Sequence, residues 1–579
     1  MSPQPQAGNQ PQAGSDERVG SADLDGRAAA VIGVLGAGTM GSGIAQLAAR
    51  SGARTLLHDP IPEALAKGVE RARDGLRKEA AKGRISEQEA EQGAERLQSV
   101  DSLEALAPCE LVIEAAPERI ELKHELYARL SEIVSEDCVL ASNTSSLLVT
   151  ALGPAASHPE RVVGMHFFNP APLMALLEVV AGEQSSERAL AVAHATGEAM
   201  GKTVIRASDG PGFLVNRCNR PFGLESLRLL QEQIADVETI DRICRMEGGF
   251  RMGPFELMDL VGVDVGFEIS KSFYAQSFGE PRWRPSMIAA RYTAAGLHGR
   301  KSGRGYYIYP AERPAPGMGP GHRPADPDAL APESLQGGEG VVVIAGEGSV
   351  AQELREASSA AGYEVRSPHD PTGGVLPALI VECDRSPSDV AAPRATAGGT
   401  DKHEASQGGA HLVLCQAGSL GALDPDGSAV GFHVLGPLAQ ASLVELTRNE
   451  GSSPVAAARA ERFFAALGKH VTWVGDAPGL VLGRIVCQVI NECAFALGEG
   501  VGDEKDIDTG MVLGLSYPRG PFDWADAIGL DRVLEILQAL QAEYGEERYR
   551  PAPALRRLVQ AGRFGRATGA GFFEYDGAS

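Results

Sequence analysis

Residues 31–41 read VIGVLGAGTMG, an apolar run that leads into the glycine pattern GxGxxG at Gly36, Gly38 and Gly41. A predicted strand, this turn and a predicted helix over 42–50 follow one another, which is the order found in dinucleotide-binding domains. Gly36 permits the tight turn, Gly38 lets the backbone approach a pyrophosphate, and Gly41 allows close contact between helix and strand. The free N–H groups at the start of the helix favour bound phosphate, so this turn predicts a dinucleotide site.

An acidic residue, Asp59, follows the second predicted strand (55–58), eighteen positions after the last glycine of the turn. A carboxylate there accepts both hydroxyls of an adenosine ribose and repels the 2′-phosphate of NADP. NAD is therefore the predicted cofactor, and Thr39 and Met40 complete its predicted contacts with the turn.

Short apolar strands alternate with helical stretches in the first part of the chain. The clearest strands are predicted at 30–35, 55–58, 111–114 and 139–142. Their alternation with helices predicts a Rossmann-like parallel sheet with helices on both faces. Because a helix-rich stretch follows, the predicted fold class is α/β plus all-α.

The composition predicts a folded protein of the cytoplasm. Of the 579 residues 43% are hydrophobic and 22% are charged, and this length corresponds to about four domains. The net charge of −23 disfavours nucleic acid and anionic membranes as partners. The eight cysteines show neither zinc-ligand spacing nor a disulfide framework, so reduced thiols and no metal are expected. Residues 1–28 lack the apolar core of a signal peptide and are predicted to be a disordered tail, and no segment is apolar for long enough to span a membrane.

The chain contains a duplication. Matching landmarks recur 267 positions apart, as from His166 to His433, and chance does not keep one spacing over many positions. The further pairs are Glu178 with Glu445, Asp209 with Asp476, Asn216 with Gly483, Asp241 with Asp508, and 253–255 with 520–522. Two segments rich in Pro, Gly and small polar residues, 310–338 and 385–409, predict a linker and an inserted loop.

Domain boundaries follow from this duplication. The predicted domains are a NAD-binding Rossmann domain at 29–208, a helical domain at 209–310, a linker at 311–338, a degenerate Rossmann-like domain at 339–475 and a second helical domain at 476–579. The second copy keeps Gly346 and Gly348, but Ala351 stands in third place, Glu347 adds an acid to the turn and Arg366 lies on the next strand. We expect this second sheet domain to be a scaffold without NAD.

A histidine and a glutamate bracket an Asn-Pro turn in HFFNPAPLMALLEVV (166–180). A neutral histidine beside the cofactor can take the proton of a substrate hydroxyl as hydride leaves the same carbon. A carboxylate on its far ring nitrogen fixes the tautomer and stabilises the imidazolium. His166 and Glu178 are therefore candidate catalytic residues, although their spacing fits a buried structural histidine beside a surface glutamate equally well.

Five motifs decide between these alternatives. They are VIGVLGAGTMGSGIAQ, LVIEAAPERIELK, SNTSSL, HFFNPAP and DGPGFLVNR, and in this order over residues 30–310 they resemble the 3-hydroxyacyl-CoA dehydrogenase family. The resemblance implies NAD-dependent oxidation of (3S)-3-hydroxyacyl-CoA to 3-oxoacyl-CoA. The duplicated form, with SYPRGPF (516–522) and YGEERYRP (544–551), resembles members that act on 3-hydroxyadipyl-CoA in bacterial phenylacetate breakdown.

The resemblance also implies roles for single residues. His166 is the general acid/base with Glu178 as its partner, and Ser145 and Asn216 hydrogen-bond the reacting oxygen or the thioester carbonyl. The implied cofactor contacts are Glu118, Lys123, Asn169 and Lys301. Lys82 falls where the family places a basic residue against the CoA phosphates, but Gly75 replaces a nearby family serine.

The second copy keeps the histidine and the glutamate but loses the groups around them. Gly483 replaces the asparagine, Ala567 replaces the lysine and Gly418 aligns with Ser145, so we expect one active site per chain. Short members of the family pair through their helical domains. This implies that residues 476–579 pack on 210–310 as an internal pseudo-dimer, and homo-oligomers are possible in addition.

Other functions are compatible with part of this pattern. A dehydrogenase of free hydroxy acids or sugar acids shares the nucleotide fold and the histidine–glutamate pair. Within the family, 3-hydroxybutyryl-CoA or general fatty-acid β-oxidation is the alternative substrate assignment. A non-catalytic NAD-binding structural protein is disfavoured, because the first copy keeps every reactive position while the second loses several.

Overall fold

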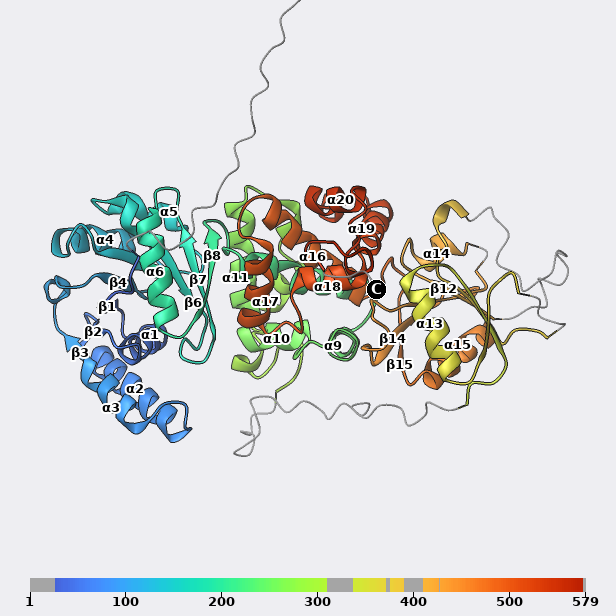
Figure 1. Ribbon diagram of the computed structural model, residues 1–579, viewed down its shortest axis with the longest axis horizontal. Coiled ribbons are helices and arrows are strands. Elements are labelled where there is room, and N and C mark those ends of the chain that lie inside the picture. The colour runs from blue at the N-terminus through green and yellow to red at the C-terminus, as the bar shows by residue number, and fades with distance from the viewer. Residues whose placement is uncertain (1–25, 310–336, 371–374, 390–409, 426, 576–579) are drawn as a thin grey trace, which may run out of the picture.

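The computed structural model describes residues 26–309, 337–370, 375–389, 410–425 and 427–575. The tail and the linker predicted from the sequence lie outside these residues except at 26–28 and 337–338, and so does most of the predicted inserted loop. At the edge of the tail, Arg27 forms an ion pair with Glu110 at 2.7 Å. Figure 1 shows the two sheet domains at opposite ends of the molecule, with helices of both copies side by side in the centre.

The first sheet has eight strands in the order β3-β2-β1-β4-β5-β6-β7-β8. They are β1 (Val31–Leu35), β2 (Arg54–His58), β3 (Leu97–Val100), β4 (Leu111–Glu114), β5 (Val139–Ser142), β6 (Val162–Phe167), β7 (Leu176–Ala181) and β8 (Thr203–Ser208). The predicted strands are confirmed, and the sheet is parallel except between β6 and β7. That antiparallel pair corrects the expectation of a wholly parallel sheet, and its short connection allows no crossover helix.

Helices cover this sheet as the α/β pattern requires. They are α1 (Thr39–Arg50), α2 (Pro62–Ala81), α3 (Glu87–Arg96), α4 (Ile120–Ile133), α5 (Val149–Leu152) and α6 (Glu187–Ala199). Helix α1 begins three residues before its predicted start and is buried from Gly41 to Ala49. Packing explains the glycine at position 75. A Cβ there would lie 1.9 Å from the Gln46 side-chain oxygen, so glycine lets α2 approach α1.

The second sheet repeats this architecture with seven strands in the order β10-β9-β11-β12-β13-β14-β15. They are β9 (Val341–Ala345), β10 (Glu364–Arg366), β11 (Leu379–Glu382), β12 (Ala410–Leu414), β13 (Val430–His433), β14 (Leu443–Thr447) and β15 (His470–Val474). Its helices are α13 (Ser349–Ala360), α14 (Leu420–Leu423) and α15 (Pro454–Ala466). The pair β13–β14 is again antiparallel, so the duplication extends to the one reversed strand pair.

The two helical segments pack against each other in the centre of the molecule (Figure 1). The first contributes α7 (Val215–Cys218), α8 (Arg220–Gln231), α9 (Val237–Met246), α10 (Pro254–Val261), α11 (Val263–Gln276) and α12 (Met287–Ala294). The second contributes α16 (Leu482–Gly498), α17 (Glu504–Leu515), α18 (Pro521–Ile528), α19 (Leu530–Tyr544) and α20 (Pro553–Gln560). Helix α16 is buried over nearly its whole length and lies against α7 and α8.

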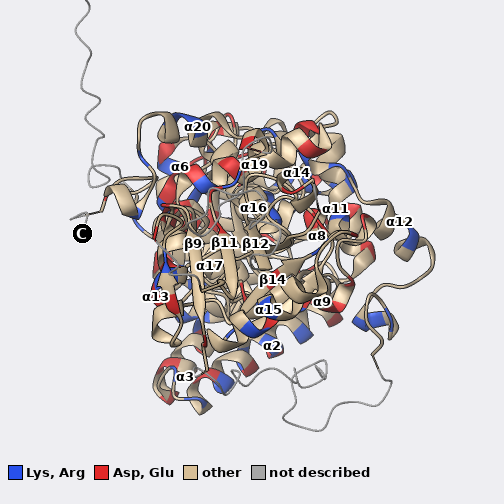
Figure 2. Cartoon of the chain, turned by 90° about the vertical axis from the view of Figure 1, so that its right-hand side faces the viewer, with Lys and Arg blue, Asp and Glu red and all other residues tan. Residues whose placement is uncertain are grey.

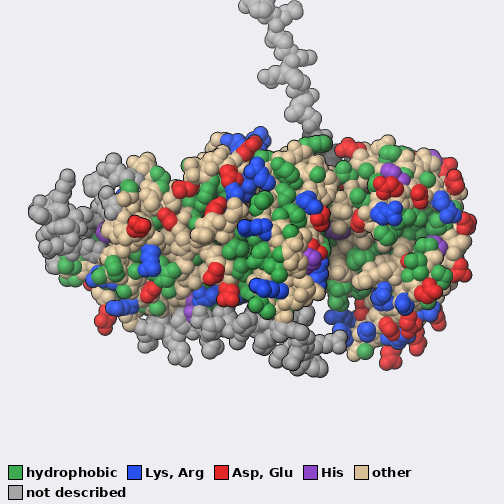
Figure 3. Space-filling model, turned by 180° about the vertical axis from the view of Figure 1, so that it is seen from behind, with side chains coloured by type: hydrophobic (Ala, Val, Ile, Leu, Met, Phe, Trp, Pro, Cys, Tyr) green, Lys and Arg blue, Asp and Glu red, His purple; other side chains and the backbone are tan. Residues whose placement is uncertain are grey.

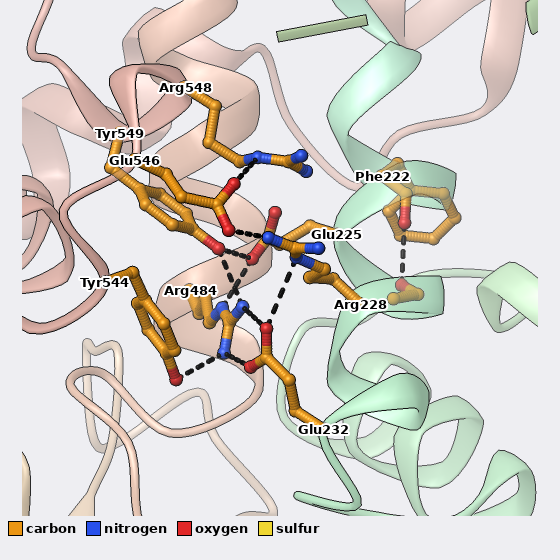
Figure 4. A network of polar contacts seen from close by, with 10 residues as sticks. Phe222, Glu225, Arg228, Glu232, Arg484, Tyr544, Glu546, Arg548 and Tyr549 are labelled. Carbon is orange, nitrogen blue, oxygen red and sulfur yellow. Dashed lines mark hydrogen bonds and ion pairs between the residues drawn. The ribbon is translucent and has the colours of Figure 1, made fainter. Parts of the chain in front are cut away.

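Buried arginines join the two helical segments through carboxylates. Arg484 of α16 is fully buried and binds Glu225 of α8 and Glu232 just after it, together with Tyr544 and Tyr549 (Figure 4). Its counterpart Arg217 binds Glu492 of α16 at 3.0 Å and Glu499 at 2.6 Å. Because a buried cation is tolerated only when it is paired, these networks fix how the two segments face each other.

Charged residues of both signs are mixed along the chain, and the cysteines are buried. Figure 2 shows Lys and Arg interspersed with Asp and Glu along the chain. All eight cysteines are buried and free. In the part of the chain that the structure describes, no helix has the length and apolar character needed to cross a bilayer.

Candidate active site

His166 and Glu178 lie directly opposite each other on the antiparallel strands β6 and β7. The imidazole Nδ1 is 2.6 Å from a carboxylate oxygen of Glu178, and both side chains are buried. Cross-strand neighbours of this kind have their side chains on the same face of the sheet. The alternative of a surface glutamate is therefore wrong: the carboxylate holds Nδ1–H, which leaves the lone pair on Nε2.

The start of the helical segment orients Glu178. One carboxylate oxygen, Oε1, accepts the backbone N–H groups of Leu214 (3.2 Å) and Val215 (2.9 Å). The other oxygen, Oε2, is left for His166. Since Val215 is the first residue of α7, this contact also fixes the start of the short helix that carries Asn216.

Aromatic rings enclose the imidazole on two sides. The ring of Phe168 lies 4.7 Å from that of His166, and the ring of Phe213 lies 5.6 Å away. Figure 3 shows the surface hollowed where the first sheet domain, on its right, meets the helical centre. Apolar walls around a base restrict water near the atom that takes the proton.

The loop after β5 brings Ser145 to this region. Glu118 holds the loop, because its carboxylate accepts the hydroxyl of Thr144 at 2.8 Å and the N–H of Ser145 at 3.3 Å. From the helical segment, Gln276 donates to the carbonyl of Ser146 at 3.2 Å. The Ser145 side chain is exposed, so its hydroxyl is accessible to a ligand.

The glycine turn fits a dinucleotide. Gly36 has a positive φ of 91°, and a Cβ at Gly41 would lie 1.8 Å from the Gly36 carbonyl, whereas a Cβ at Gly38 would meet open space. The first N–H groups of α1 have no partner within the helix and point toward this space. Asp59 accepts N–H groups from Ala37 (2.8 Å) and Ile61 (2.9 Å), one on each oxygen. Each oxygen keeps a lone pair that a ribose hydroxyl can use.

The remaining predicted contact residues are Lys123, Lys301, Asn169 and Lys82. Lys123 is buried and bonds both oxygens of Glu114 at 2.7 Å, whereas Lys301 pairs with Asp264 on the helical segment. Asn169 is exposed and precedes a cis peptide bond to Pro170. Lys82 is exposed at the end of α2. Glu114 also accepts the N–H of Ala116, which lies against Gly36, so Lys123 is linked to the glycine turn through this carboxylate. The contacts of all four residues with ligands remain predictions.

Sequence reasoning missed one basic residue at the turn. Arg71 of α2 reaches across to α1 and donates to the Ser42 hydroxyl at 3.1 Å and to the Ala37 carbonyl at 3.4 Å. A guanidinium at the start of the nucleotide-binding helix complements phosphate charge. Its helix carries several other charges, so only the packing of α2 on α1 could single it out.

In the second copy, the same pair of residues is arranged differently. His433 and Glu445 again lie opposite each other, on β13 and β14, and both are fully buried. The two oxygens of Glu445 each accept one backbone N–H, from Val481 and Leu482, both at 2.8 Å. Neither ring nitrogen of His433 has a hydrogen-bond partner among the described residues. A Cβ at Gly483 would lie 2.5 Å from the His433 ring, so the ring occupies the space that a larger residue at position 483 needs.

A carboxyl group from the first copy lies beside His433 and Glu445. Glu247, just after α9, is buried, and ligand atoms of Glu247, His433 and Glu445 all lie within 4.8 Å of one another. Burial raises the pKa of Glu445 to about 7 and the pKa of Glu247 well above its ordinary value. Burial lowers the pKa of His433 to about 3, so this imidazole is neutral at pH 7.

The second glycine turn has an acid, Asp384, beside it. Asp384 accepts the N–H of Glu347 at 2.8 Å, and a Cβ at Gly346 would lie 2.5 Å from an oxygen of the same carboxylate. The equivalent N–H in the first copy, that of Ala37, is also held by a carboxylate, from Asp59, so the two turns differ in where the acid lies. Asp384 lies against Gly346 and adds negative charge where a pyrophosphate would approach. The sequence signal was available, because Asp384 is the second residue after β11 whereas Ala116 is the second residue after β4.

Comparisons with known proteins agree with this geometry. The family model "3-hydroxyacyl-CoA dehydrogenase, NAD binding domain" matches residues 31–210, and "3-hydroxyacyl-CoA dehydrogenase, C-terminal domain" matches 212–309 and again 479–575. The 3-hydroxyadipyl-CoA dehydrogenase of Escherichia coli K12 is 34% identical over 92% of this chain and 98% of its own length. A probable 3-hydroxybutyryl-CoA dehydrogenase of Deinococcus radiodurans is 39% identical over 48% of this chain and 99% of its own.

A solved structure covers almost the same length. The crystal structure of 3-hydroxybutyryl-CoA dehydrogenase from Escherichia coli K12 superimposes with a TM-score of 0.73 at 32% identity, covering 92% of this chain and 99% of that one. The NAD-binding domain is thus shared with these relatives, and the two Escherichia coli proteins also match over the duplicated part. The chain belongs to the 3-hydroxyacyl-CoA dehydrogenase family.

Proposed function

We propose that this chain oxidises (3S)-3-hydroxyacyl-CoA to 3-oxoacyl-CoA with NAD, and that 3-hydroxyadipyl-CoA is its substrate. The observation that carries the proposal is the buried pair of His166 and Glu178, whose Nδ1 and Oε2 atoms lie 2.6 Å apart, in a domain that matches the family's NAD-binding domain. Family membership supports the reaction, and the similarity to a 3-hydroxyadipyl-CoA dehydrogenase over 92% of the chain supports the acyl group.

The proton transfer depends on His166. Its Nδ1–H is held by Glu178, so Nε2 is the atom that accepts the proton of the substrate 3-hydroxyl. The Glu178 carboxylate then stabilises the imidazolium, and the N–H groups of Leu214 and Val215 keep that carboxylate in place. A base positioned in this way contributes about 10²- to 10⁴-fold to the rate. Bound NAD supplies the acceptor for the hydride that leaves C3.

Neutral donors complete the proposed site. Ser145 and Asn216 stabilise the negative charge that gathers on the 3-oxygen or the thioester carbonyl in the reverse direction. Glu118 contributes by holding the loop that carries Ser145. Lys82, at the exposed end of α2, is proposed to contact the CoA phosphates, and the glycine turn with Asp59 to hold NAD.

The pairing of the two helical segments is proposed to replace a partner subunit. The contacts of α16 with α7 and α8, and the carboxylate networks of Arg484 and Arg217, support an internal pseudo-dimer. On this proposal the domain boundaries near 208, 310, 338 and 475 separate two copies of one ancestral unit. Further association of whole chains is compatible with it.

A substrate panel tests the proposed function. NADH formation is measured with 3-hydroxybutyryl-CoA, 3-hydroxyhexanoyl-CoA and 3-hydroxyadipyl-CoA, and with free 3-hydroxyadipate as the control that lacks CoA. The expected result is the highest kcat/KM with the adipyl thioester and no turnover of the free acid. A highest kcat/KM with 3-hydroxybutyryl-CoA, which the name of the similar crystal structure suggests, would overturn the substrate assignment but not the reaction.

A further inference from the structure

Arg220 differs from the other arginines of the helical centre in its partners. Arg217, Arg282 and Arg484 each bind at least two carboxylates. For Arg220, the contacts with described residues are the Ser270 hydroxyl at 3.3 Å and the face of the Phe273 ring at 4.9 Å. Its Nε is buried without a hydrogen-bond partner among the described residues.

An arginine in this state is still a cation. Burial lowers the pKa of Arg220 to about 10, and no charged neighbour is among the causes, so the guanidinium is protonated at pH 7. The residue as a whole is half-buried, so part of its surface is accessible although Nε is not. Removing a charge from water without pairing it is costly, so an arginine with no carboxylate partner is a candidate to bind an anionic group of a ligand.

The position of Arg220 connects it with the catalytic pair. It follows Asn216 by four residues, and Asn219 between α7 and α8 keeps right-handed helical dihedral angles, so both side chains lie on one helical face. Phe273 beneath the guanidinium packs against Gly212, since a Cβ at Gly212 would lie 2.0 Å from its ring. The next residue, Phe213, packs against His166.

The same wall reaches the loop of Ser145. Phe273 and Gln276 lie three residues apart on α11, and Gln276 binds the carbonyl of Ser146. Arg220, Phe273 and Gln276 therefore line one side of the region that contains the proposed acyl site. In a six-carbon dicarboxylyl chain the far carboxylate lies about 4 Å beyond C3, so a cation that binds it must lie close to the catalytic pair.

We propose that Arg220 binds the distal carboxylate of a dicarboxylic 3-hydroxyacyl-CoA and thereby determines the preference for that substrate class. This inference rests on the proposed function. The second copy has Cys487 at the corresponding position, which is buried and carries no positive charge, as expected for a copy that binds no substrate. A planar guanidinium pairs with a carboxylate through two parallel hydrogen bonds, which neither Ser270 nor Phe273 can provide.

The test compares two substrates of equal chain length. We measure kcat/KM for 3-hydroxyadipyl-CoA and for 3-hydroxyhexanoyl-CoA, which lacks the distal carboxylate, in the wild type and in Arg220→Met. The adipyl value is expected to fall by about 10²- to 10³-fold, mainly through KM, while the hexanoyl value changes less than about threefold. Arg220→Lys keeps the charge without the planar fork, so it should fall between the two.

Controls separate folding, substrate class and the role of the residue. Arg291→Met removes an exposed arginine of the same helical segment and should leave both kcat/KM values unchanged. If Arg220→Met does not fold, the adipyl-to-hexanoyl ratio is taken from Arg220→Lys and Arg220→Gln. A wild type that does not prefer the adipyl thioester contradicts the proposed substrate, whereas a wild type that prefers it and an Arg220→Met variant that keeps this preference contradict only the role of Arg220.

Discussion

The first histidine–glutamate pair of the chain is bonded and the second is not, although both occupy the same register on equivalent strands. His166 bonds Glu178 at 2.6 Å, whereas both ring nitrogens of His433 lack a hydrogen-bond partner among the described residues. The difference lies in the carboxylates. Glu178 receives both backbone N–H groups on one oxygen and keeps the other for histidine, while Glu445 receives one on each.

This comparison shows that retained residues do not preserve a site. The second copy keeps the two reactive residue types but has a glycine against the ring, an acid from the other copy beside the carboxylate and Asp384 on the glycine turn. Catalysis by a general base needs the base, its partner and the cofactor together. We therefore propose that the first copy performs the chemistry and that the second has a structural role.

The carboxylates provide the sharpest contrast. Glu178→Gln removes the charge that stabilises the imidazolium, so kcat should fall by about 10²- to 10³-fold while the KM for NAD changes little. Glu445→Gln should leave kcat unchanged. Steady-state NADH formation measures both variants, and an unchanged kcat in Glu178→Gln would remove this residue from the mechanism.

Exchanging one residue between the two glycine turns tests why the second copy is expected not to bind NAD. Ala116→Asp places a carboxylate where the second copy has Asp384, next to the glycine turn. Its repulsion of the pyrophosphate should raise the KM for NAD by about 10- to 100-fold, because like charges a few ångströms apart interact strongly near a protein surface. The matched variant Asp384→Ala should change neither KM nor kcat. A normal KM for NAD in Ala116→Asp would show that this carboxylate does not explain the difference between the turns.

The smallest expected effect concerns stability in the second copy. Burial raises the pKa of Glu445 to about 7 and that of Glu247 well above 4.5, so both acids bind protons more tightly in the folded chain than in the unfolded one. Stability is therefore lost as the pH rises from about 4.5 to beyond 7. The side chain in Glu247→Gln cannot ionise. Between about pH 5 and pH 8 the Tm of this variant should therefore decline by a few degrees less than the Tm of the wild type.

Other buried acids contribute to the same trend and serve as the background. Burial also raises the pKa values of Asp241 and Asp508 to about 7, so the slope should be reduced in Glu247→Gln rather than abolished. Thermal denaturation followed at several pH values measures it. If Tm falls with pH equally steeply in the wild type and in Glu247→Gln, ionisation of Glu247 does not contribute to the loss of stability.

The sequence predicted the parts of the fold that depend on local pattern. The glycine turn, Asp59 and the strands before and after them have short-range signals, and the structure has the expected strands. The antiparallel pair β6–β7 was not predicted, although the short HFFNPAP connection excludes a crossover helix. It is this reversal that places Glu178 opposite His166.

Contacts between the copies could not be predicted from local pattern. Glu247 reaches the pair of His433 and Glu445 only because the helical segment of one copy packs on the sheet domain of the other. Two arginines, Arg217 and Arg220, follow Asn216 within four residues. Only packing shows that Arg217 is paired with a carboxylate and that the Nε of Arg220 has no partner among the described residues. Periodicity carries no information about such partners.

Turnover of two histidine variants tests the central claim most directly. Under saturating NAD and 3-hydroxyacyl-CoA, with folding checked by circular dichroism, His166→Gln should lose NADH formation down to background and still bind NAD, whereas His433→Gln should turn over like the wild type. Substantial activity in His166→Gln, or its loss in a folded His433→Gln, would contradict an account in which the first copy alone performs the chemistry.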